Sequence, residues 1–360
     1  MKKDKLPDLV IGDMVINPPI IQGGMGARVS LSSLASAVSN CGGLGVIASV
    51  GLASGDVPED QYEGQSLEGL RSEIRKTKKL TQKPFGVNIM FALTNFESLV
   101  KISIEEGASA IISGAGLPLN LPSLTEGSDI KLIPIVSSGR AASIILRVWK
   151  KRYNRLPDAI VVEGPLAGGH LGFNYTKAVG IEEVSLEDIV TEVLKVREDY
   201  QANNNKIPVV AAGGIFTGKD IAKMLRIGAS GVQMATRFVG TEECDAHPKY
   251  KEVYLKSKED DIVVILSPAG MPARVIKNGL VEKIQAGEKL KFKCPFRCLK
   301  TCDPYAANYC IADALINAYG GNLSEGFAMC GANAYRVKKI VSVKELMNEL
   351  TSEAIKEYYG

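Results

Sequence analysis

The stretch IPVVAAGGIFTGKDIAKMLRIGASGVQMATRF, residues 207–238, decides the fold. It opens with the apolar run Ile207–Ala212, meets a Gly-Gly pair, and returns to a second apolar run at Gly231–Ala235. Both runs are continuously hydrophobic rather than alternating. A strand that is buried on both faces, as in a parallel sheet, requires such a pattern. The stretch therefore predicts two parallel strands joined by a helical connection.

The same alternation extends toward the N-terminus. Segments with helical signals separate the runs, among them residues 30–38, 96–106 and 185–200. Eight strand–helix units in about 240 residues favour a (β/α)8 barrel, an α/β fold, over an open doubly wound sheet with extra strands, which stays the alternative. The predicted strands are Pro19–Gln22, Leu44–Ser49, Phe85–Met90, Ala110–Ser113, Leu132–Val136, Ala159–Val162, Ile207–Ala212 and Gly231–Ala235.

The alternation stops after Phe238, and the chain becomes polar, interrupted by prolines and rich in cysteine. We predict three parts: a cofactor-binding barrel over residues 1–240, a mostly helical lobe over 241–325, and a helical C-terminal segment over 326–360 that packs on the barrel. Loops that carry chemistry gather at the C-terminal mouth of a barrel. The lobe is therefore expected to cover that mouth and the substrate.

Composition excludes several classes of partner. Subtracting 40 acidic from 43 basic residues leaves a net charge of +3, spread along the chain, which gives no footprint for nucleic acid or for a membrane surface. The longest apolar stretches are about ten residues, half of what a membrane span needs. The N-terminus lacks the apolar core of a signal peptide. We expect a cytoplasmic protein with a small-molecule substrate.

Glycine-rich turns follow two of the predicted strands, at Gln22–Gly26 and Ala212–Ile215, and the eighth strand runs into Met234-Ala-Thr-Arg237. Glycines at strand ends let the backbone approach a ligand closely and present free N–H groups to it. The seventh and eighth loops of a barrel are where a phosphate most often binds. Neither GxxxxGK[ST] nor a GxGxxG motif at a strand end is present, so a P-loop or a Rossmann domain lacks support. A phosphate-bearing cofactor is the expected occupant.

The sixth predicted strand continues as Glu163-Gly-Pro-Leu-Ala-Gly-Gly-His-Leu-Gly-Phe173. His170 lies there among glycines, and the chain has 2 histidines in all. Its place after a buried strand indicates a catalytic group that titrates near neutrality. His247, in a polar stretch before a proline, is expected to be structural.

These motifs together resemble the nitronate monooxygenase family, which also contains flavin-dependent enoyl-acyl carrier protein reductases. The resemblance covers about residues 15–280 and rests on PIIQGGMG (19–26), VNIM (87–90), EGPLAGGHLG (163–172), VVAAGGI (209–215) and QMATRF (233–238). It implies a barrel that holds FMN without a covalent bond. Carried over residue by residue, it implies that the flavin ring contacts Gly24, Met25, Asn88 and Gly172. The phosphate and ribityl chain would contact Gly213, Gly214, Gln233, Met234, Ala235 and Thr236.

The resemblance implies two possible reactions at the same site. In a nitronate monooxygenase, His170 would act as a base toward a nitroalkane, or would hydrogen-bond the nitro oxygens of a preformed nitronate, and O2 would complete an oxidation to a carbonyl compound and nitrite. In the alternative, NAD(P)H would reduce FMN, and the enzyme would reduce an enoyl thioester. A homodimer is possible in either case.

The lobe carries Cys294, Cys298, Cys302 and Cys310 at spacings that match no standard zinc or ferredoxin signature. Seven cysteines form an odd count in a chain without an export signal, which argues against a disulfide framework. We expect reduced, partly buried thiols and no metal, with a zinc or iron–sulfur site as the less favoured alternative.

Overall fold

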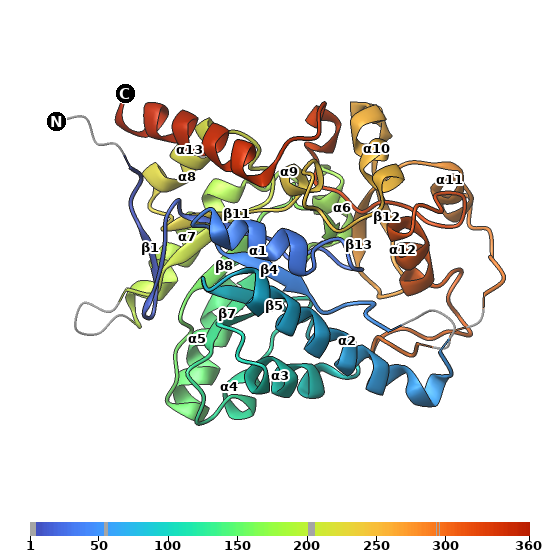
Figure 1. Ribbon diagram of the computed structural model, residues 1–360, viewed down its shortest axis with the longest axis horizontal. Helices are drawn as coiled ribbons and strands as arrows, with labels where there is room; N and C mark the ends of the chain where they lie inside the picture. The colour runs from blue at the N-terminus through green and yellow to red at the C-terminus, as the bar shows by residue number, and fades with distance from the viewer. Residues whose placement is uncertain (1–4, 54–56, 201–205, 293, 295) are drawn as a thin grey trace.

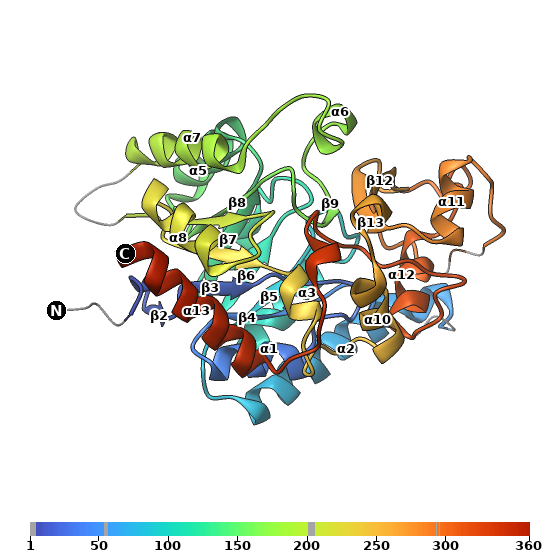
Figure 2. The ribbon, with the colours of Figure 1, turned by 90° about the horizontal axis from the view of Figure 1, so that it is seen from above.

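The computed structural model describes residues 5–53, 57–200, 206–292, 294 and 296–360. Its centre is an 8-stranded parallel sheet in which β3 pairs with β11 at one end of the strand order and β4 stands at the other. A parallel bridge between Ile21 and Leu44 joins β3 to β4 and closes the barrel (Figures 1 and 2). The strands are β3 (Ile20–Gln22), β4 (Gly45–Ala48), β5 (Phe85–Asn88), β6 (Ala110–Ser113), β7 (Lys131–Val136), β8 (Ile160–Glu163), β10 (Val209–Ala212) and β11 (Gly231–Met234). The predicted (β/α)8 barrel is confirmed, with a strand at each of the predicted runs, and the open sheet is wrong.

Several helices that follow the strands begin at a polar residue whose side chain caps the helix N-terminus. The Ser185 side chain accepts a hydrogen bond from the Asp188 N–H at the start of α7, and Thr217 and Asp220 form a capping box on α8. These caps satisfy backbone N–H groups that a helix start leaves without partners. The helices of the barrel are α1 (Ser32–Asn40), α2 (Glu59–Leu80), α3 (Phe96–Glu105), α4 (Leu121–Leu124), α5 (Gly139–Tyr153), α7 (Leu186–Glu198) and α8 (Gly218–Ile227).

An N-terminal hairpin closes the bottom of the barrel. Strands β1 (Leu9–Ile11) and β2 (Met14–Ile16) pair antiparallel, and their buried side chains share one apolar cluster with inward-facing barrel residues such as Val161 and Val210. The hairpin was not predicted from the sequence. Because apolar side chains fill this end, the opposite end is left for a ligand.

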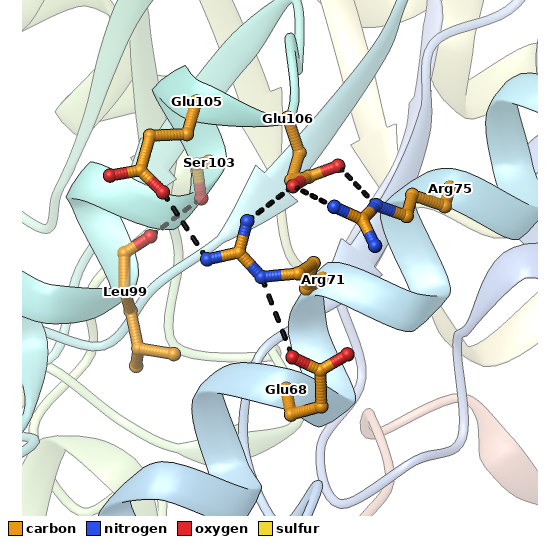
Figure 3. A network of polar contacts seen from close by, with 7 residues as sticks. All are labelled: Glu68, Arg71, Arg75, Leu99, Ser103, Glu105 and Glu106. Atoms are coloured by element: carbon orange, nitrogen blue, oxygen red, sulfur yellow. Dashed lines mark hydrogen bonds and ion pairs between the residues drawn. The ribbon is translucent and has the colours of Figure 1, made fainter.

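Helices α2 and α3 are joined by a network of charged side chains (Figure 3). Arg75 donates to Glu106 over 2.7 Å, and Arg71 contacts Glu68, Glu105 and Glu106. The two arginines hold the pKa of Glu106 below its usual value. The network fixes α2, whose N-terminal half reaches over the lobe.

The lobe beyond the barrel contains a β-hairpin in addition to helices. Strands β12 (Ile262–Leu266) and β13 (Pro272–Ile276) pair antiparallel, and β13 also pairs with β9 (Gly169–His170) from the barrel. The lobe was expected to be mostly helical, and this 3-stranded sheet was not predicted, because apolar and polar residues do not alternate clearly along its strands. The helices here are α10 (Pro248–Lys256), α11 (Gly279–Gln285) and α12 (Ile311–Tyr319), while α6 (Tyr175–Ala178) and α9 (Thr236–Val239) lie in loops that follow barrel strands.

The C-terminal helix α13 (Val343–Tyr359) packs on the barrel beside α8 (Figure 1). Glu353 accepts a 2.7 Å hydrogen bond from the Gly218 N–H, and a Cβ at Gly218 would lie 2.5 Å from the backbone nitrogen of Ala354. The two helices therefore approach more closely than a side chain at Gly218 would allow. Among the described helices, none combines the length and apolarity needed to cross a membrane.

Candidate active site

A cavity lies at the C-terminal ends of the barrel strands and beneath the lobe. The barrel side of its wall is formed by strand ends and the loops that follow them, and the lobe side by side chains such as Tyr254, Cys298, Leu315 and Met329. Segments far apart in the sequence therefore meet at one site, where a (β/α)8 barrel normally carries its chemistry.

The structure brings nearly all of the predicted site residues into this wall. His170 lines the cavity, and so do the residues expected to contact a flavin, namely Gly24, Met25, Asn88, Gly213, Gly214, Gln233, Met234, Ala235 and Thr236. Gly172 lies elsewhere: a Cβ at this position would be 2.4 Å from the Ser137 hydroxyl oxygen. Gly172 thus packs on the loop after β7, and its predicted contact with the flavin stays a prediction.

Two kinds of glycine shape the barrel wall. A Cβ at Gly24 would lie 2.4 Å from the Cβ of Asn88, so any side chain there would displace Asn88. Gly213 and Gly214 instead have φ values of 97° and 82°, which residues with a side chain rarely adopt. Asn333 from the C-terminal segment donates a 2.7 Å hydrogen bond to the Gly214 carbonyl and holds this loop in place.

The wall offers unpaired polar groups to a ligand. Within the described part of the chain, the backbone N–H groups of Gly213, Gly214, Ala235 and Thr236 donate no hydrogen bond. The Oε1 atom of Gln233 is buried and has no partner among the described residues. Buried polar groups are normally paired, so these groups indicate a missing ligand. A cluster of N–H donors suits a phosphate, and a lone acceptor suits an N–H of a heterocycle, so the residues present fit FMN.

His170 is held by the lobe hairpin. Its Nε2 atom lies 2.7 Å from the Ser267 hydroxyl, and that hydroxyl also accepts a 3.1 Å hydrogen bond from the Ala269 N–H. When Ser267 donates its proton to Nε2, the neutral imidazole carries its own proton on Nδ1, and this is the tautomer that the proposed function uses.

Burial lowers the pKa of His170 from 6.5 to about 4, since the surrounding protein disfavours the charged imidazolium. Among the described residues, no acidic group acts against this shift. The imidazole is thus neutral at pH 7, where Nδ1–H can donate a hydrogen bond but the ring is a weak base.

Arg274 supports the loop that carries His170, and Glu163 stands at the start of that loop. Arg274, 6% exposed on β13, donates to the carbonyl oxygens of Pro165 and Ala178 over 2.8 Å, and to that of Ala167. Glu163 lines the cavity at the end of β8, and burial raises its pKa to about 7, although the nearby Arg274 acts in the opposite direction. The loop is therefore fixed by an arginine that the hairpin supplies.

Sequence reasoning missed Ser267, Glu163, Arg274 and Asn333 as site residues. Glu163 adjoins the glycine-rich motif and could have been found there. Ser267 and Asn333 carry no local signal. His247 caps α10, where its Nδ1 accepts from the Lys249 N–H over 3.1 Å, which confirms the structural expectation.

Comparison with known proteins agrees with this geometry. Residues 8–353 match the nitronate monooxygenase family. A probable nitronate monooxygenase of Staphylococcus saprophyticus is 30% identical over 306 residues, which cover 78% of this chain and 81% of the relative. The (3aS,4S,5R,7aS)-5-hydroxy-7a-methyl-1-oxo-octahydro-1H-indene-4-carboxyl-CoA dehydrogenase of Mycobacterium tuberculosis is 32% identical, covering 77% of this chain and 68% of that protein.

Solved structures show the same relationship. FabK from Thermotoga maritima is 33% identical, with a TM-score of 0.72 over 94% of this chain and 93% of that chain. The nitroalkane oxidase from Streptomyces ansochromogenes has a TM-score of 0.73 over 94% of this chain and 96% of its own, at 20% identity, and thus shares the fold.

Fold and site together define an oxidoreductase of the flavin-dependent class on a (β/α)8 barrel. More particularly, the chain belongs to the nitronate monooxygenase family.

Proposed function

We propose that the protein binds FMN and oxidises small alkyl nitronates with O2 to a carbonyl compound and nitrite. The observation that carries this proposal is His170, held by Ser267, in a cavity whose barrel wall presents unpaired N–H donors and the unpaired Gln233 acceptor. The family match supports a flavin-dependent oxidoreductase, and this wall supports FMN as the flavin.

The cofactor would be held by the barrel wall. The free N–H groups of Gly213, Gly214, Ala235 and Thr236 would bind the phosphate, and Gln233 would accept from the ring system. Ala235 suits this role because only its backbone N–H is needed. Bound FMN would supply the electron acceptor of the oxidation. Gly24 would let the ring lie against Asn88.

His170 would bind the substrate as a hydrogen-bond donor. A nitronate carries its negative charge on the nitro oxygens, and the Nδ1–H of a neutral imidazole would stabilise that charge inside a low-dielectric cavity. A base with a pKa of about 4 would remove a proton from carbon poorly at pH 7. The anionic nitronate is therefore a better substrate for this geometry than the neutral nitroalkane.

A second candidate is the reduction of an enoyl thioester by FMN and NAD(P)H. Its support is the apolar lobe wall of Leu299, Ile311 and Leu315, which offers a surface for an acyl chain, and the carboxyl-CoA in the name of the Mycobacterium tuberculosis relative. Under this reading His170 would bind the thioester carbonyl. A cytoplasmic location and a homodimer stay predictions in either case.

Oxygen uptake by the FMN-loaded protein separates the two candidates. With an alkyl nitronate and no nicotinamide cofactor, we expect O2 consumption together with nitrite release. No uptake, with anaerobic bleaching of the flavin by NAD(P)H and its recovery on adding an enoyl thioester, would overturn nitronate oxidation in favour of the reductase.

A further inference from the structure

Four cysteines of the lobe converge behind the cavity. Cys294, Cys298 and Cys310 pack around one small buried cluster formed by Ala53, Tyr62, Phe296 and Ala312. The fourth, Cys302, lies close enough to interact electrostatically with Cys298, as do the other two thiols. The fold thus gathers cysteines separated by up to 16 residues in the sequence (310 − 294 = 16), and all of them are free thiols.

We propose that these four cysteines bind a [4Fe–4S] iron–sulfur cluster. Four cysteine thiolates are the usual ligand set of such a cluster, and soft sulfur ligands select it over harder ions. Cys294, Cys298 and Cys302 come from the irregular segment between α11 and α12, and Cys310 is the residue that caps α12.

A single zinc ion fits the arrangement less well. Sulfurs bound tetrahedrally to one zinc at 2.3 Å lie about 3.8 Å apart. Among the described residues, no three His, Cys, Asp or Glu side chains are placed to hold one metal ion. The cysteine ligands of a polynuclear cluster bind different irons, so their sulfurs lie farther apart than sulfurs bound to one zinc. Four neighbouring thiols that are too widely spaced for one zinc ion are therefore compatible with a cluster.

The start of α12 favours negative charge at Cys310, although the carboxylates of Asp303 and Asp313 act in the opposite direction. The N–H groups of Ala312 and Asp313, at the start of α12, approach the Cys310 sulfur, and the positive end of that nine-residue helix faces the same point. Amide donors stabilise cluster sulfurs and ligand thiolates.

The site is also shielded from water. Tyr62 of α2 is 7% exposed and meets Phe296 edge-to-face at 5.2 Å, which covers the cysteines from the barrel side.

Cys298 connects this site to the cavity. It lines the cavity wall together with Leu299 and Ala312, so the cluster would stand directly behind the flavin cavity. The Cys298 carbonyl accepts a 3.1 Å hydrogen bond from the Thr94 N–H, which ties the cysteine segment to the loop after β5. A cluster here would be a one-electron centre adjoining the flavin site.

Metal analysis of the full chain tests the proposal. After anaerobic purification, or reconstitution with ferrous iron and sulfide, we expect about four iron and four sulfide per chain, a broad absorption near 400 nm and an EPR signal on reduction with dithionite. Cys298→Ser and Cys302→Ser should each lower the iron content severalfold. Cys41→Ser, outside the site, should leave it unchanged.

Three results would overturn the proposal: no iron after reconstitution, stoichiometric zinc in its place, or iron that persists in both serine variants. The wild-type analysis alone decides if a variant fails to fold. Iron and sulfide are counted independently of flavin content and of turnover, so failure here leaves the proposed reaction at the flavin site standing.

Discussion

The two walls of the cavity present different chemical groups. The barrel wall presents backbone: glycines at strand ends, free N–H groups and the single orphan oxygen of Gln233. The lobe wall presents side chains, including two tyrosines and the cysteine segment, and the lobe also supplies the serine that holds His170. Under the proposed function, the backbone groups of the barrel wall would bind the cofactor and the side chains of the lobe wall would contact the substrate. The barrel would then determine which cofactor binds, and the lobe which reaction follows.

The largest effect should come from removing the group at the boundary of the two walls. His170→Ala should reduce kcat for nitronate oxidation roughly 100- to 1000-fold, as expected for loss of one donor to a developing or fixed anion. Bound FMN, measured by its absorbance, should be unchanged because the barrel wall is intact. Loss of flavin with normal turnover per bound FMN would show that His170 serves cofactor binding rather than turnover, and would contradict the division of roles between the two walls.

Gly24→Ala should damage the barrel wall instead. The added Cβ lies 2.4 Å from Asn88, and such overpacking costs about 1–3 kcal/mol, which predicts roughly 10- to 100-fold weaker FMN binding. Turnover at saturating FMN should fall far less. Gly64→Ala on α2 is the matched control, since no atom lies within 4 Å of a Cβ there. Equal FMN affinity in both variants would contradict the assignment of Gly24 to the cofactor wall.

The barrel wall was largely predictable and the lobe wall was not. The hydrophobic pattern locates the end of each strand, and the C-terminal ends of all the strands lie at one end of a barrel. The glycines after β3 and β10 and the residues after β11 could therefore be assigned to one site from the sequence. The partners of His170 come from segments with no such periodicity: Ser267 lies in a hairpin turn and Asn333 near a short 3₁₀ helix, at positions set by tertiary packing. The hairpin β12–β13 escaped prediction for the same reason.

The lowered pKa of His170 predicts how stability depends on pH. Between about pH 6.5 and 4 the unfolded chain binds a proton at this residue and the folded protein does not, so stability is lost as pH falls through that window. From pH 7 to 5 this residue alone should cost the wild type about 2 kcal/mol, roughly 30-fold in the unfolding equilibrium constant. Urea unfolding of wild type and His170→Gln at both pH values measures the difference. The same pH dependence in both proteins would exclude a buried neutral imidazole.

Ser267→Ala should give the smallest effect. The variant keeps His170 but frees its Nε2, so the proton is no longer confined to Nδ1. We expect roughly a 10-fold loss of kcat, the low end for groups that orient a functional histidine. Ser267→Thr should recover most of that loss, because it restores the hydroxyl. Wild-type turnover in the alanine variant would mean that the lobe hairpin does not orient His170.

The central claim is that His170 acts as a neutral donor to an anionic substrate. The ratio of kcat/KM for an alkyl nitronate to that for the corresponding neutral nitroalkane, measured with one FMN-loaded preparation at pH 7, tests it most directly. We predict a ratio of roughly 100 or more, since a base of such low pKa would contribute little of the usual 100- to 10,000-fold from proton transfer. Comparable values for the two substrates would show that the enzyme removes the proton itself, and would contradict the assigned state of His170.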